Sequence, residues 1–294
     1  MSRNLMLRIA FAAVAIPVAL WGIYRGGWVL ASLLALLGVV GTWEVYGLAQ
    51  RQGIRPLTVL GLLGAAAIPL LGWMSLIPAV RGVECYYCAT ASRWVLPLAA
   101  IWLMGVFGDA LRLRTPGERP LAAIAVTVLA PLYASGLLTF LYILRYGPVG
   151  AVNPLSGLAY AALPLVAMWV CDTAAMAVGT LVGGPKLVPV VSPNKTWSGA
   201  IGGIVASVIA VFVFRALLPA NGAVSLTSLE LALVGIAVAL FGQIGDVAES
   251  LLKREAGVKD SSDLIPGHGG LLDRLDSLYF AIPATALLYF VFQL

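Results

Sequence analysis

Long apolar stretches alternate with short polar connections along almost the whole chain. About 20 consecutive apolar residues are enough for a helix to cross the hydrocarbon core of a bilayer. On this criterion nine segments are predicted to span a membrane: residues 5–24, 27–49, 57–79, 94–111, 120–144, 157–182, 197–218, 229–252 and 276–294. The pattern therefore predicts an all-α, polytopic integral membrane protein with about nine transmembrane helices in one bundle.

The composition supports this class. Of the 294 residues, 61% are hydrophobic and only 11% are charged, and the mean hydropathy is +0.98, far from the values of soluble globular domains. No internal repeat and no long linker divides the chain. We therefore expect a single membrane domain over residues 1–294, with an N-terminal bundle at about 1–150 and a catalytic half at about 157–294 that contains the polar motifs.

The distribution of basic residues predicts the orientation. With nine spans, the N-terminus and the connections on its side hold 13 of the 18 lysines and arginines, and the opposite side holds five. Short cytoplasmic loops carry the excess of basic residues in membrane proteins. The N-terminus and these connections are therefore predicted to be cytoplasmic, with the C-terminus outside. The formal net charge of +5 does not call for nucleic acid, because basic residues on the cytoplasmic side also meet anionic lipid headgroups.

Two carboxylates lie within predicted spans. Asp172 is in "MWVCDTAAM", and Asp246 is in "FGQIGDVAES" near the cytoplasmic end of its span. Ionisable side chains in a bilayer face the bundle interior or water, and they commonly mark functional sites. The alternative is a carboxylate that only pairs with a neighbouring helix or reaches the interface. By contrast Cys85 and Cys88, in "CYYC", are interpreted as a structural or adventitious pair, because two cysteines are too few for a metal site.

The connection "GGPKLVPVVSPNKTWSG" joins the sixth and seventh predicted spans. Ser192, Lys195 and Thr196 are predicted to lie just ahead of the seventh helix or in its first turn. Free backbone amides at a helix start attract anions, and a lysine strengthens this attraction. The segment alone favours a phosphate site no more than an interfacial loop whose lysines contact lipid headgroups.

A second connection, "KREAGVKDSSDLIPGHGGLLDRLD", is long for a helical bundle and rich in glycine and aspartate. Glycines such as Gly269 and Gly270 let the backbone approach a ligand closely. Asp273 and Asp276 are three residues apart where the chain enters the last helix, so their carboxylates are predicted to lie on one face. With Asp246 they form an oxygen-ligand set suited to Mg²⁺. The alternative is a solvated charged loop in which Asp273 or Asp276 caps a helix.

The stretch "SLLKREAGVKDSSDLIPGHGGLLDRLD" resembles the signature of the phosphatidate cytidylyltransferases, also called CDP-diacylglycerol synthases, along its whole length. The upstream "DTAAMAVGTLVGGPKLVPVVSPNKTW" is similar to a second conserved stretch of that family. Two positions depart from the family pattern: Ser198 stands where a carboxylate is expected, and Met176 where an aromatic residue is commoner. The resemblance covers roughly residues 171–280, and elsewhere it rests only on apolar spans.

The resemblance implies that a phosphate oxygen of phosphatidic acid attacks the α-phosphorus of CTP, which gives CDP-diacylglycerol and pyrophosphate. Such a reaction needs charge neutralisation and positioning more than a protein nucleophile. The predicted catalytic residues are Asp246, Asp273, Asp276, Lys253 and Arg274, with Mg²⁺ held by the three aspartates. The predicted substrate-binding residues are Ser192, Lys195, Thr196, Arg254, Lys259, Asp260, His268, Gly269, Gly270 and Asp172.

The same resemblance implies a bacterial inner-membrane enzyme, with membrane lipid around it and a homodimer as the family expectation. The sequence does not decide whether a second, monovalent cation assists Mg²⁺. The rival classes are a cation or proton transporter that uses Asp172 and Asp246, a CTP-dependent lipid kinase, and a noncatalytic membrane scaffold. A transporter would leave the glycine- and aspartate-rich connection unexplained, and a lipid kinase would lack the full signature.

Overall fold

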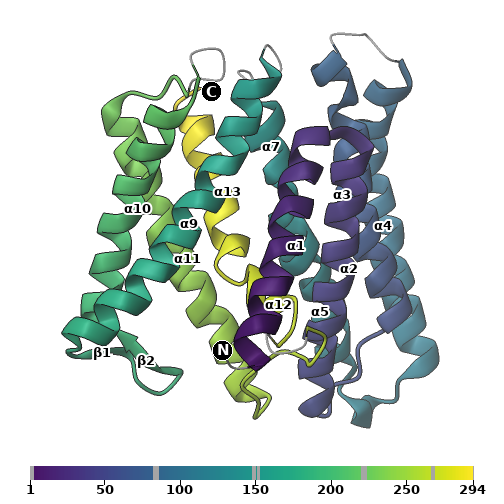
Figure 1. Cartoon of the computed structure of the whole chain (residues 1–294). Coiled ribbons are helices and arrows are strands. Elements are labelled where there is room, and N and C mark those ends of the chain that lie inside the picture. The colour runs from purple at the N-terminus through teal and green to yellow at the C-terminus, as the bar shows by residue number, and fades with distance from the viewer. Residues whose placement is uncertain are drawn as a thin grey trace. The chain divides into compact units, whose positions relative to one another are not determined.

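The computed structural model describes residues 3–81, 86–147, 150, 153–219, 224–265 and 269–293. By its contacts the chain divides into two compact units. Unit 1 comprises Met1–Thr139 and Glu255–Arg274, and unit 2 comprises Phe140–Arg254 and Leu275–Leu294. Figure 1 shows the chain as almost entirely helical, which confirms the predicted fold class.

Unit 1 contains the N-terminal helices. They are α1 (Arg3–Arg25), α2 (Gly27–Arg51), α3 (Thr58–Arg81), α4 (Tyr86–Leu113), the 3₁₀ turn η1 (Pro116–Glu118), and α5 (Pro120–Pro131), which continues through the π-helical turn η2 (Leu132–Gly136) into α6 (Leu137–Thr139). Helix α3 packs against α2, α4 and α5. The four-residue helix α12 (Leu272–Leu275) begins in the later part of this unit, and its last residue belongs to unit 2.

Apolar side chains and a few polar contacts hold these helices together. Leu57, Val106 and Ala110 form a buried cluster. Trp102 packs on this cluster, and its indole Nε1 donates to the carbonyl oxygen of Leu60 at 2.8 Å. Within an apolar helix pair, such a bond satisfies the one polar atom that a tryptophan carries.

Unit 2 contains α7 (Leu141–Tyr146), α9 (Pro154–Val182), the strands β1 (Lys186–Val188) and β2 (Ser192–Thr196), α10 (Trp197–Leu217), α11 (Ser228–Glu255) and α13 (Leu278–Val291). Helices α9 and α10 pack along each other, and the two strands join them as an antiparallel hairpin (Figure 1). The pair can approach closely because small residues line it. A Cβ on Gly199 would lie 2.6 Å from the carbonyl oxygen of Ala175 and 3.2 Å from the Cα of Gly179.

Each of the predicted apolar segments coincides with a helical stretch. Among the described residues, seven helices are long and apolar enough to cross a membrane. The chain is therefore an integral membrane protein, but the count of nine spans is not confirmed. Helix α13 has 14 residues, and at 1.5 Å per residue it is shorter than the hydrocarbon core of about 30 Å.

Three details differ from the expected arrangement. The connection between the sixth and seventh spans is a β hairpin rather than a plain loop. The chain turns between α12 and α13, so Asp273 and Asp276 do not share the face of one helix. Residues Glu255–Arg274 group with unit 1, whereas the predicted catalytic half began at residue 157 and included them.

Candidate active site

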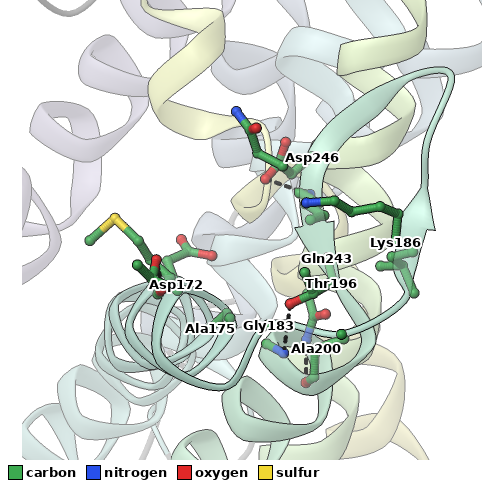
Figure 2. A pocket seen from close by; sticks show the side chains of 16 residues that line it. Asp172, Ala175, Gly183, Lys186, Thr196, Ala200, Gln243 and Asp246 are labelled. Atoms are coloured by element: carbon green, nitrogen blue, oxygen red, sulfur yellow. Dashed lines mark hydrogen bonds and ion pairs between the residues drawn. The ribbon is translucent and has the colours of Figure 1, made fainter.

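Unit 2 contains a pocket of about 630 Å³. Its wall comes from the second half of α9, from the β1–β2 hairpin, and from the facing turns of α10 and α11. Four of the predicted site residues line it: Asp172, Lys195, Thr196 and Asp246. The pocket thus brings together a carboxylate from each of two membrane helices and a lysine from the hairpin (Figure 2).

The hairpin is held to the two helices that it joins. Thr196 is the N-cap of α10, and its hydroxyl oxygen accepts from the backbone N–H of Gly199 at 3.2 Å. The hydroxyl of Ser198 donates to the carbonyl oxygen of Gly183, at the end of α9. Ser198, one of the two departures from the family pattern, therefore closes the base of the hairpin. The other, Met176, is an exposed side chain in the pocket wall.

An ion pair crosses the pocket wall. Lys195 Nζ lies 2.6 Å from Asp246 Oδ2, and the two side chains are 24% and 31% exposed. Figure 2 shows Lys186 reaching from β1 toward Asp246, while Asp172 faces the same space from α9. Because these side chains are partly buried, water screens their charges less than it would in bulk solution. Their charges can therefore act more strongly on an anion in the pocket.

The carboxylate of Asp276 is close enough to Asp246 to be affected by its charge. Its Oδ1 accepts from the backbone N–H of Ser277 at 2.7 Å, just before α13. Burial and the nearby charge of Asp246 raise the pKa of Asp276 to about 7. The negative charge of Asp246 thus disfavours the ionised form of Asp276.

The remaining basic residues at the end of α11 have protein partners. Lys253 Nζ lies 3.0 Å from Glu249 Oε1, one turn earlier on α11, and both side chains are nearly inaccessible to solvent. Arg254 Nε donates to the carbonyl oxygen of Val191, in the hairpin, at 3.2 Å. Lys253 is thus a buried, paired lysine, and Arg254 connects the end of α11 to the hairpin next to Ser192.

The part of the signature that lies in unit 1, Glu255–Arg274, is called the signature segment below. It folds around the carboxylate of Asp273. Its Oδ2 accepts from three donors at 2.8 Å each: the backbone N–H and the hydroxyl of Ser261, and the backbone N–H of Gly270. Gly269 has φ +78°, in the left-handed region that favours glycine. The carboxylate of Asp273 therefore closes the loop on itself, in addition to any role toward a ligand.

A carboxylate that the sequence interpretation did not select lies beside this loop. Glu44, on α2, is 1% exposed. Its Oε1 accepts from Ser262 Oγ at 2.5 Å and from the N–H of Leu271 at 2.9 Å, and its Oε2 accepts from the N–H of Leu272 at 2.6 Å. The hydroxyl of Ser261 lies 3.2 Å from the same Oε2. Unit 1 thus holds the signature segment through a buried acid.

The predicted site residues belong to two groups. Unit 2 contains Asp172, Ser192, Lys195, Thr196, Asp246, Lys253, Arg254 and Asp276, and unit 1 contains Lys259, Asp260, Gly269, Gly270, Asp273 and Arg274. His268 lies outside the described residues, as does Cys85, and the side chain of Cys88 is not described either. Over the described part of the chain, no three acidic, histidine or cysteine side chains are grouped so that they could hold a metal. A joint Mg²⁺ site of Asp246, Asp273 and Asp276 stays a prediction.

Sequence reasoning missed several polar residues that the structure places in these sites. Lys186, Asn194 and Gln243 line the pocket of unit 2, and Glu44 contacts the signature segment of unit 1. Lys186 and Asn194 could have been selected, because both lie in the connection already interpreted as a phosphate site. Glu44 lies near the end of an apolar span, where a single acid resembles an interfacial residue.

Comparison with known proteins places the chain in a family. Residues 6–292 match the model of the family described as "Cytidylyltransferase family". The chain belongs to the cytidylyltransferase family. This confirms the family predicted from the signature and the predicted class, a nucleotidyltransferase of the membrane.

Individual relatives agree with this assignment. The chain is 30% identical to the phosphatidate cytidylyltransferase of Staphylococcus epidermidis over 284 residues, which cover 96% of the chain and 98% of the relative. It is 43% identical to the enzyme of the same name from Staphylococcus saprophyticus over 45% of the chain, and it spans about half (49%) of that relative's length. With the relative of that name from Brucella suis it shares 49% identity, over 42% of each chain.

Proposed function

We propose that this protein is a CTP:phosphatidate cytidylyltransferase that works in the cytoplasmic membrane of a bacterium, with its site facing the cytoplasm. The observation that carries the proposal is the ion pair of Lys195 and Asp246 in the wall of a 630 Å³ pocket, in a member of the cytidylyltransferase family. The names of the relatives support the choice of phosphatidate as acceptor. The basic residues predicted on one side of the membrane support a cytoplasmic site, where CTP is available.

The reaction exchanges one phosphorus–oxygen bond for another. An oxygen of the lipid phosphate forms a bond to the α-phosphorus of CTP. The bond from that phosphorus to the oxygen bridging the β-phosphate breaks, and pyrophosphate leaves with the electron pair. The attacking oxygen is already ionised, so no side chain needs to remove a proton. The protein's task is to bring two anions together and to stabilise the charge on the leaving group.

Lysines of the hairpin are suited to this task. Lys186 and Lys195 both line the pocket and would offset the negative charge of bound phosphates. Asp246 holds the ammonium group of Lys195 at 2.6 Å, which limits where that charge can lie. Asn194 and Gln243 add polar groups that can hydrogen-bond a substrate. The pocket thus combines cationic and neutral donors around one cavity.

The carboxylates fit Mg²⁺ as a cofactor. Mg²⁺ in nucleotide enzymes commonly takes one or two protein carboxylates and completes its shell with water and substrate phosphates. Asp246 and Asp276 would supply such a pair, and burial together with the charge of Asp246 raises the pKa of Asp276. Asp273 is the third predicted ligand. When bound, Mg²⁺ would neutralise charge on the phosphates of CTP.

The test is transfer of label from CTP to lipid by the purified protein in vesicles that contain phosphatidic acid and Mg²⁺. With CTP labelled at the α-phosphate, label should enter the lipid fraction, and with CTP labelled at the γ-phosphate it should appear only in pyrophosphate. Label from the γ-phosphate in lipid would identify a CTP-dependent lipid kinase instead. No lipid label from either nucleotide, with protein that unfolds cooperatively on heating, would contradict the proposal.

A further inference from the structure

The buried carboxylate of Glu44 is directed at a segment far from it in the sequence. The residues that donate to it, Ser261, Ser262, Leu271 and Leu272, follow it by 217 to 228 positions. Glu44 itself is on α2, a helix long and apolar enough to span a membrane. Burying a carboxylate in such surroundings costs free energy unless hydrogen bonds replace the lost water. Here the hydrogen bonds of one loop supply the replacement.

The donors are arranged two to each oxygen. Oε1 accepts from the hydroxyl of Ser262 and the N–H of Leu271, and Oε2 accepts from the N–H of Leu272 and faces the hydroxyl of Ser261. Hydrogen bonds to an ionised acceptor are roughly twice as strong as neutral ones. The carboxylate therefore fixes the backbone at two consecutive residues, immediately ahead of Asp273 and Arg274.

Ser261 connects Glu44 to Asp273. Its hydroxyl lies 3.2 Å from Glu44 Oε2 and 2.8 Å from Asp273 Oδ2. A hydroxyl has a single hydrogen to donate, so Ser261 can serve only one of the two carboxylates at a time. Its backbone N–H also donates to Asp273. A movement of Glu44 would thus change the surroundings of the Asp273 carboxylate without any direct contact between the two acids.

The glycine of the signature fits the same arrangement. A Cβ on Gly270 would collide with Ser261 Oγ and with the carboxylate of Glu44. Gly270 is buried, and its N–H donates to Asp273 Oδ2. The close approach of backbone, serine and acid therefore explains why this position has no side chain. It also shows that the loop is packed tightly around Glu44.

We infer that Glu44 is a positioning residue for the reaction: it holds residues 270–273 so that Asp273 and Arg274 are presented in one orientation to Mg²⁺ and phosphate. This inference rests on the proposed function, in which Asp273 is a ligand of Mg²⁺. In this role Glu44 acts through Ser261 and the backbone and does not itself have to contact substrate or metal. Its loss should weaken Mg²⁺ binding through the loop, and it should leave the pocket of unit 2 folded.

The test compares Glu44→Gln with the wild type. An amide keeps one oxygen acceptor and replaces the other by a donor, so two of the four donors lose their partner. Hydrogen–deuterium exchange of the peptide that contains Leu271 and Leu272 should become about tenfold faster or more, since a hydrogen bond to a charged group contributes about that factor. The Mg²⁺ concentration for half-maximal label transfer should rise by a similar factor, about tenfold.

Two further variants sharpen the comparison. Glu118→Gln is the matched control: Glu118 is also a carboxylate of unit 1 that accepts from a backbone N–H, that of Thr115, but it lies at η1 on the surface. It should leave both measurements unchanged. Ser262→Ala removes one donor and keeps the buried acid. It should shift both measurements in the same direction as Glu44→Gln, but by less. It replaces Glu44→Gln as the test if that variant does not fold.

The outcomes separate the inference from the proposed function. Wild-type exchange and wild-type Mg²⁺ dependence in folded Glu44→Gln and Ser262→Ala would overturn the positioning role, whereas label transfer by the wild type would still stand. Faster exchange throughout the chain with an unchanged Mg²⁺ dependence would also overturn it, since Glu44 would then be only a structural residue. An inactive wild type would contradict the proposed function, and the local exchange at Leu271 and Leu272 would still show whether Glu44 fixes the loop.

Discussion

Lys195 and Asp246 place opposite charges in one pocket wall, and each limits the position of the other. The carboxylate of Asp246 has a lysine on Oδ2, and its Oδ1 lies 3.4 Å from the hydroxyl of Ser250. If Asp246 binds a metal, it has to do so while it is paired with Lys195. Because the side chain is 31% exposed, water and cations can reach it without unfolding the helix.

Replacing Asp246 by asparagine should lower turnover by a hundredfold or more, on the order of the effect of removing one electrostatic group from an active site. The variant loses the partner of Lys195 and the negative charge that would attract Mg²⁺, and it keeps the size of the side chain. Turnover measured against Mg²⁺ concentration checks this, with the melting temperature as the test of folding. Asp109→Asn, in α4 of unit 1, is the matched control and should behave as wild type. Near-normal turnover and Mg²⁺ dependence in Asp246→Asn would remove this residue from the metal site.

Single residues show where sequence interpretation succeeds and where it stops. Asp246 and Lys195 were found because a charge in a membrane span and a lysine before a helix start are both unusual in their local surroundings. Glu44 was not found, because its hydrogen-bond partners follow it by more than 200 positions. The residues near it in the sequence give no indication of them. Contacts between distant segments depend on packing, which local patterns do not specify.

At the scale of helices and strands, apolar length predicts the helices well and the hairpin poorly. The predicted span 197–218 corresponds to α10 at Trp197–Leu217, because a transmembrane helix must satisfy its own backbone over the whole apolar stretch. Strands β1 and β2 have three and five residues and lie in a segment with three prolines. Neither strand shows the alternation of apolar and polar residues that predicts a strand.

The packing of α9 on α10 gives a test at this scale. Gly199→Ala should lower the melting temperature, because its Cβ would meet the carbonyl oxygen of Ala175 at 2.6 Å, and overpacking of this kind costs about 1–3 kcal/mol. Activity should fall as well, since Gly199 follows the cap residue Thr196 and lines the pocket. Gly108→Ala, in α4, is the control: no atom lies within 4 Å of its Cβ position. It should leave stability unchanged or raise it slightly, by about 0.5–1 kcal/mol. Equal melting temperatures for both variants would contradict the close packing.

At the scale of the whole molecule, the two units divide the signature between them. The catalytic half predicted from the sequence treated residues 157–294 as one block, because the polar motifs lie next to one another along the chain. By contact, α11 as far as Arg254 belongs to unit 2, and the glycine- and aspartate-rich segment Glu255–Arg274 belongs to unit 1. Residues that are adjacent in the sequence can thus form one motif and still belong to two different structural units.

The orientation of the chain in the membrane is the prediction that belongs to this scale. It rests on the 13 lysines and arginines assigned to one side against five on the other. In a variant without Cys85, Cys88 and Cys171, single cysteines at two exposed positions, Val190 in the hairpin and Asp263 in the signature segment, should react with a membrane-impermeant maleimide only after the cells are opened.

A cysteine at Arg25, an exposed position assigned to the opposite side, should react in intact cells and shows that the reagent reaches the membrane surface. The hairpin and the signature segment must share one side if both handle the phosphates of CTP, because a charged nucleotide does not cross the hydrocarbon core. Labelling of only one of the two from outside would therefore contradict more than the orientation. It would separate Lys195 from Asp273 by the width of the membrane, and a single cytidylyl-transfer site that uses both could not exist.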